Sequence, residues 1–247
     1  MDIFISILAL SLPVVITGLF ALYFKLNQHV FKLVLAFSAA YLFSTTIMHL
    51  LPEVYAINNF KLVGLFIVVG FSAQLLIENL STGLEHGHSH HHSDTCKKHF
   101  PYGIIIGLLI HSFLEGLPVY QSGNHLHAHI GSHTNHQLVF GLIVHNIPIS
   151  FLFVALLKDH SVKWFSIIIF LILFSLMAPL GYLFSYTIHS FEAAGLMKYQ
   201  FVADAIVIGI FLYISTAILF ETSEDHKYSP SKIISMLIGI GLAFILS

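Results

Sequence analysis

The 247-residue sequence predicts an all-α membrane protein, a bundle of eight transmembrane helices with both termini extracytoplasmic. Composition is the first observation, because 57% of the residues are hydrophobic and only 9% are charged, which lies outside the range of soluble domains. Patterning is the second, because the apolar residues form eight runs long enough to cross a bilayer. These runs are continuously apolar and do not alternate, which excludes a β-barrel.

The predicted helices follow one another along the chain and form a single transmembrane domain, residues 1–247. The first, residues 3–23, is predicted to be a membrane helix, because a charged n-region and a small-residue cleavage site of a signal peptide are missing. Polar or Pro/Gly-containing turns separate the other seven, at residues 33–54, 61–80, 102–120, 138–157, 164–187, 200–221 and 231–247.

The lysines predict how this bundle is oriented. Cytoplasmic loops of membrane proteins carry an excess of basic residues. With the N-terminus outside, only Lys61 and Lys198 face the exterior, and eight of the ten basic residues face the cytoplasm: Lys25, Lys32, Lys97, Lys98, Lys158, Lys163, Lys227 and Lys232.

Two connections are rich in histidine, and this topology places them on opposite sides of the membrane. Residues 81–101 form the cytoplasmic loop and residues 121–137 the external loop. Histidine tracts of this kind bind metals, although a polar linker that happens to use histidine remains an alternative. Cys96, in the first loop, is either a soft metal ligand or a spectator thiol.

The fourth predicted helix carries His111 and Glu115, one helical turn apart on the same face. Ionisable side chains at membrane depth are costly and normally mark an ion or substrate path. Imidazole and carboxylate are ligands that suit Zn²⁺ and similar divalent ions. The alternative is that the two side chains only hydrogen-bond each other.

The fifth predicted helix carries His145, Asn146 and Pro148. A proline inside a helix removes one backbone hydrogen bond, which here leaves the carbonyl of Val144 free near His145. An ordinary proline kink is the competing interpretation. Gly116 and Gly141 are expected to serve close helix packing.

Further ionisable residues lie near the predicted helix ends. His49 and Glu53, at the outer end of the second helix, are either an entrance site for a metal or a solvated cap. Glu78 and the acidic end of the seventh helix are expected to be solvated, with the reception of an exiting cation as a further role.

Five motifs, in order on the expected helices, resemble those of the ZIP (Zrt/Irt-like) divalent-metal transporters. The resemblance implies eight spans, a histidine-rich cytoplasmic loop and an intramembrane metal centre. The motifs are residues 49–53 (HLLPE), 111–116 (HSFLEG), 145–150 (HNIPIS), 175–181 (SLMAPLG) and 209–213 (GIFLY).

The sequence departs from the family pattern where members hold a second metal. The resemblance implies ligands of that second metal at positions that are here Ser112, Asn146 and Ala178, so the second site has lost its carboxylates. At the first metal, the ligand position on the fifth helix is Ile149. His145 lies one turn before Ile149 on the same face and could replace the missing ligand. The expected centre is therefore a single ion held by His111, Glu115 and His145, with Ser112, Asn146 or water completing the shell.

The leading hypothesis is a multi-pass transporter in the plasma or cell inner membrane that moves Zn²⁺, with Fe²⁺ and Mn²⁺ as alternatives, into the cytoplasm. It is not an enzyme, and its partners are the metal ion, the lipid bilayer and, as one option, a second copy in a homodimer. A net charge of −2 does not indicate the basic surface that binds nucleic acid. Two alternatives remain, a degenerate metal sensor or buffer, and an intramembrane zinc hydrolase with a metal-activated water.

Overall fold

The computed structural model describes residues 3–25, 27–57, 60–81, 102–120, 131–190, 200–220 and 229–246. All regular structure within these ranges is helical, and each of the eight predicted membrane helices is present. Seven helices are long and apolar enough to cross a membrane, and the eighth, α9, is a shorter apolar helix. The chain is a multi-pass α-helical membrane protein.

The helices follow the predicted runs closely. They are α1 (Ile3–Tyr23), α2 (Gln28–Thr45), α3 (Leu51–Ile57), α4 (Phe60–Ser81), α5 (Tyr102–Gly116), α6 (Gly131–Asp159), α7 (Trp164–Ser190), α8 (Gln200–Phe220) and α9 (Pro230–Leu246). A π-helical turn, Thr46–Leu50, joins α2 to α3, and a 3₁₀ turn, Leu117–Val119, follows α5. The second predicted span is thus α2, the π-helical turn and α3 together.

Two helices begin earlier than the hydropathy pattern predicts. The side chain of Asn27 caps α2 by accepting a hydrogen bond from the amide of His29 at 2.9 Å, so the helix starts among polar residues. Helix α6 begins at Gly131, which makes residues 131–137 of the predicted external loop helical. Polar residues extend a helix beyond its apolar core because adding a turn to an existing helix is easy.

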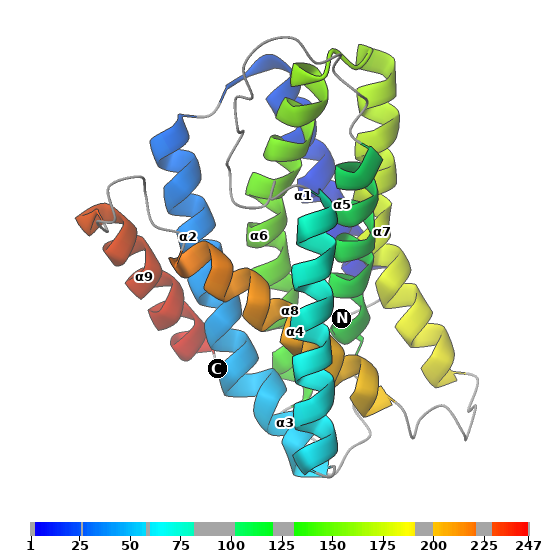
Figure 1. The fold of residues 1–247 in the computed structure, drawn as a ribbon, viewed down its shortest axis with the longest axis vertical. Helices are drawn as coiled ribbons and strands as arrows, with labels where there is room; N and C mark the ends of the chain where they lie inside the picture. The colour runs from blue at the N-terminus through cyan, green and yellow to red at the C-terminus, as the bar shows by residue number, and fades with distance from the viewer. Residues whose placement is uncertain are drawn as a thin grey trace.

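The helices form two groups that meet at a seam. Helices α2, α4, α8 and α9 pack mainly on one another, and so do α1, α5, α6 and α7. Figure 1 shows α2 and α9 on one side of the molecule and α5 and α7 on the other, with α8 crossing between them behind α4. Contacts of α2 with α6 and of α4 with α5 join the two groups.

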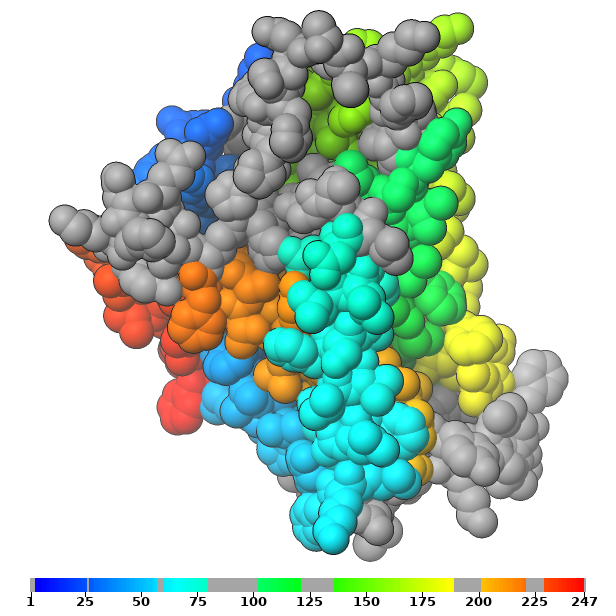
Figure 2. Space-filling view, in the orientation of Figure 1, coloured from blue at the N-terminus to red at the C-terminus, as the bar shows by residue number. Residues whose placement is uncertain are grey.

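Large apolar side chains cover the outside of the bundle, as expected for a protein surrounded by lipid. On α4, which Figure 2 shows in cyan across one face of the molecule, the exposed residues include Leu62, Leu65, Val68, Leu75 and Leu76. Helix α9 likewise exposes Ile234, Leu237 and Ile238.

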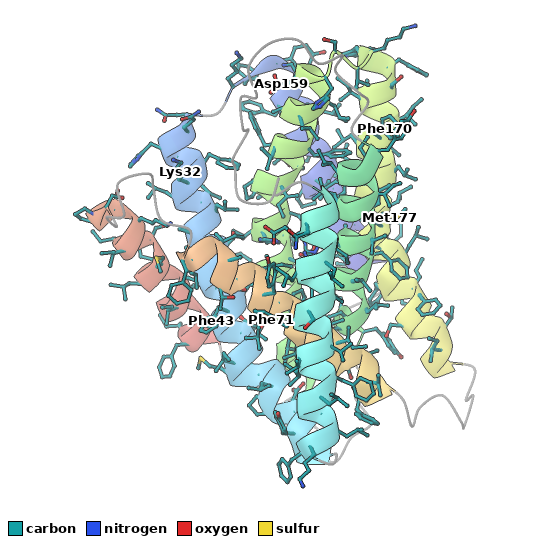
Figure 3. The ribbon with its side chains drawn as sticks, in the orientation of Figure 1. Lys32, Phe43, Phe71, Asp159, Phe170 and Met177 are labelled. Atoms are coloured by element: carbon teal, nitrogen blue, oxygen red, sulfur yellow. The ribbon has the colours of Figure 1, made fainter. Side chains whose placement is uncertain are left out.

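One hydrogen bond joins the C-terminal ends of α1 and α6. Lys158, near the end of α6, donates from Nζ to the carbonyl of Leu22 at 2.9 Å, and so occupies a carbonyl at the C-terminal end of α1. Lys32 and Asp159 lie toward the same end of the molecule (Figure 3). The first turns of α2 and the end of α6 therefore lie on the same side of the bundle.

Candidate metal site

His111, Glu115 and His145 come together inside the bundle. Nε2 of His111 lies 3.1 Å from Oε1 of Glu115, and Nε2 of His145 lies 3.5 Å from the same oxygen. Neighbouring ligand atoms around a tetrahedral zinc ion are about 3.3 Å apart, given bonds of about 2.0–2.1 Å. Both contacts are therefore close to the spacing that one small ion requires.

The three side chains are completely buried, with no exposed surface on any of them. Among the residues that the structure describes, neither ring nitrogen of His145 has a hydrogen-bond partner. Burying such groups without partners is costly. A cation between them would supply the missing interaction, which favours a metal site over a simple pair of hydrogen-bonded side chains.

Close packing of α5 against α7 fixes where Glu115 lies. A Cβ atom added to Gly116 would collide with the carbonyl oxygen of Ala178, so only glycine allows this approach of the two backbones. His111 lies one turn earlier on the same face of α5. The packing role predicted for Gly116 is confirmed, and the same holds for Gly141, whose added Cβ would lie 2.9 Å from Cε1 of Tyr41.

Two further predicted ligands are buried next to the histidines. Asn146 is 2% exposed, its side chain lies beside the Glu115 carboxylate, and its Oδ1 atom has no hydrogen-bond partner in the described residues. Ser112 is also 2% exposed and follows His111 directly in α5. Of the two, Asn146 has the contact that a fourth ligand needs.

Apolar packing occupies the positions where the family pattern has further ligands. Ile149 belongs to an apolar cluster with Val154 and Phe174, and Ala178 belongs to another with Leu142 and Phe211. On α6, His145 and Asn146 lie next to Glu115, and Ile149 does not.

His49 and Glu53 are not part of the group formed by the two buried histidines and Glu115. His49 lies in the π-helical turn and Glu53 in the first turn of α3. Tertiary packing brings Asp204 of α8 close enough to Glu53 for their carboxylates to interact electrostatically, which the sequence pattern did not reveal. Isolated π-helical turns are frequent at functional sites.

The expectation that Glu78 is a solvated helix end is wrong. Glu78 is only 7% exposed, and Gln74, one turn earlier, is fully buried. Helix α4 packs on both α8 and α5, which covers this face. The histidines of residues 82–101 and 121–130 and the acidic residues after Phe220 lie outside the described residues.

The comparisons with known proteins agree with this arrangement. No curated protein matches the chain. The model of the family described as ZIP Zinc transporter matches residues 98–247, more than half of the chain, and the match includes α5 and α6 with all three buried ligand-type side chains. The chain therefore belongs to the ZIP family, and it is a divalent-metal transporter of the membrane and not an enzyme.

Proposed function

We propose that the chain carries Zn²⁺ into the cytoplasm through one intramembrane site formed by His111, Glu115 and His145. The observation that supports this most directly is the geometry of two fully buried imidazoles around one oxygen of the fully buried Glu115 carboxylate. Two imidazoles and a carboxylate are a ligand set that zinc accepts, with Asn146 or water as the fourth ligand. Fe²⁺ and Mn²⁺ are the alternative ions.

The charge of the site suits transport better than storage. With neutral imidazoles, the single carboxylate offsets only half of the charge of a divalent ion. The remaining charge is costly in a medium of low dielectric constant, so binding is weaker than at a site with two carboxylates. An ion held in this way can be released again.

The site also lies where a movement of the two helix groups could expose it. His111, Glu115 and His145 belong to α5 and α6, which are the helices of their group that meet α4 and α2 across the seam. Relative movement of helix groups around a buried site is a common way to achieve alternating access. In the orientation that the lysine bias supports, the histidines of residues 121–137 would collect the ion outside and those of residues 81–101 would receive it in the cytoplasm.

Uptake of radioactive zinc by proteoliposomes tests this proposal. His111→Ala, Glu115→Ala and His145→Ala are each expected to abolish most of the uptake. His160→Ala is the matched control, because this half-buried histidine lies after α6 and contacts the carbonyl of Leu156 instead of the site. Equal uptake by the wild type and the three site variants would contradict the proposed path.

A metal sensor or buffer is the second candidate, because Ile149 and Ala178 are packed in apolar clusters where the family pattern has ligands. Tight zinc binding by the full chain without any flux across the bilayer would favour this function.

A further inference from the structure

A second set of buried polar atoms with unfilled hydrogen-bonding capacity lies at the seam between α2 and α6. Thr45 is 1% exposed and Gln137 is 5% exposed. Within the described residues, neither polar atom of the Gln137 side chain has a hydrogen-bond partner, and the Thr45 hydroxyl has none other than the phenol of Tyr41. Each such atom costs about 1–3 kcal/mol when left unsatisfied, so buried groups of this kind normally have a partner. Their number at one seam points to a ligand or to water.

Tyr41 brings these groups to the same place. Its hydroxyl donates to the backbone carbonyl of Gln137 at 3.1 Å. Thr45 follows Tyr41 by one turn of α2, and its hydroxyl lies beside the Tyr41 phenol. The Thr45 hydroxyl from one helix group and the backbone carbonyl of Gln137 from the other therefore both contact the Tyr41 hydroxyl.

Gln137 lies on the same face of α6 as the metal-site residue His145. Gln137, Gly141 and His145 are spaced by four residues and share one face of the helix. Gln137 precedes His145 by two turns, about 12 Å along the axis. The ring of Tyr41 packs against Gly141, which lies between them.

We propose that Thr45 and Gln137 form a neutral transit site for the divalent cation, on the side of the metal site nearer residues 121–130. Tyr41 is its positioning residue. A hydroxyl and an amide oxygen can replace waters of a hydrated ion one at a time, without the charge that would hold the ion firmly. The ion then passes to Glu115 and the two histidines. This inference rests on the proposed transport function.

A transit site and a bound structural water predict different effects on the rate of ion entry. A water would satisfy the same atoms and contribute to stability, but its loss would not slow an ion. The rate of ion entry therefore separates the two cases. In both cases, changes at Thr45 or Gln137 should leave equilibrium zinc binding at His111, Glu115 and His145 unaffected. Neither Thr45 nor Gln137 belongs to that group.

The experiment compares initial rates of zinc uptake into proteoliposomes with equilibrium zinc binding by the full chain in detergent. Thr45→Val and Gln137→Leu remove the proposed oxygens. Thr46→Val is the matched control, because Thr46 is fully buried in the next position but its hydroxyl already donates to the carbonyl of Leu42 at 2.8 Å. Thr45→Ser restores the hydroxyl in case valine only disturbs packing.

We expect Thr45→Val and Gln137→Leu each to lower the maximal uptake rate about tenfold, which corresponds to about 1.4 kcal/mol at the rate-limiting step. Zinc binding should stay at the wild-type level, Thr46→Val should transport normally and Thr45→Ser should recover most of the rate. Rates of Thr45→Val and Gln137→Leu equal to that of Thr46→Val would overturn the transit site and indicate a structural water. Normal uptake by His111→Ala would instead overturn the proposed function, and a wild-type chain without uptake would overturn both.

Discussion

Nε2 of His145 lies 3.5 Å from Oε1 of Glu115, although the two residues belong to different helices, α6 and α5. A metal held by both would therefore link the two helices. His111 lies one turn before Glu115 in the same helix, so His145 is the ligand that makes the site depend on tertiary structure. The first prediction concerns this residue.

His145→Ala is expected to weaken zinc binding by about ten- to a hundredfold, because it removes one of three ligands; each factor of ten corresponds to about 1.4 kcal/mol. Ile149→Val, one turn along the same helix, should leave affinity nearly unchanged, since Ile149 packs in an apolar cluster. Equilibrium dialysis of the purified chain against zinc measures both affinities. An equal loss in the two variants would show that His145 acts through packing.

Zinc binding should become weaker as the pH is lowered. Imidazoles bind the metal in their neutral form and carboxylates in their ionised form, so protons compete with the ion for all three side chains. Calorimetric titration in two buffers of different ionisation enthalpy should reveal proton release on binding. Affinity that stays constant between pH 8 and pH 5, on the order of a thousandfold change in proton concentration, would argue against histidine ligands.

Gly116→Ala should destabilise the protein and weaken zinc binding. The added methyl group would meet the Ala178 carbonyl and push α5 away from α7, next to Glu115. Overpacking of this kind typically costs about 1–3 kcal/mol. Gly241→Ala provides the control, because a Cβ atom there has no neighbour within 4 Å. Thermal unfolding in detergent should show a lower Tm for the first variant only.

Lys158→Ala should lower the free energy of unfolding by about 1 kcal/mol, because it removes the hydrogen bond from Nζ to the Leu22 carbonyl at the end of α1. Lys163→Ala removes the same charge from an exposed position nearby and should have little effect. Zinc uptake should persist in both, since neither residue touches the buried site. Unfolding curves that coincide for the two variants would show that the bond contributes nothing measurable.

The helices could be predicted from the sequence because the bilayer imposes a minimum length on every apolar run. The boundary errors at Gln28 and Gly131 arose where polar residues continue a helix beyond the apolar core. The pairing of His111 with Glu115 follows from helical spacing alone. The place of His145 was predicted by combining that spacing with the family pattern.

Other features depend on contacts between helices that one sequence does not disclose. Glu78 is buried because α4 packs on α8 and α5, whereas its place near a helix end suggested solvent. The π-helical turn at His49 likewise has no simple signature in residue spacing. Thr45 is an ordinary polar residue within an apolar run, and Gln137 belongs to the predicted external loop. Only the approach of α2 to α6 makes Gln137 a neighbour of Tyr41.

The single carboxylate of the buried site has an electrical consequence. With neutral histidines, the empty site carries one negative charge, and the site loaded with a divalent ion carries one positive charge. A membrane potential that is negative inside acts on each charge with about 2.3 kcal/mol per 100 mV for a complete crossing. Such a potential would draw the loaded site inward and drive the empty site outward, so voltage would favour both halves of an import cycle.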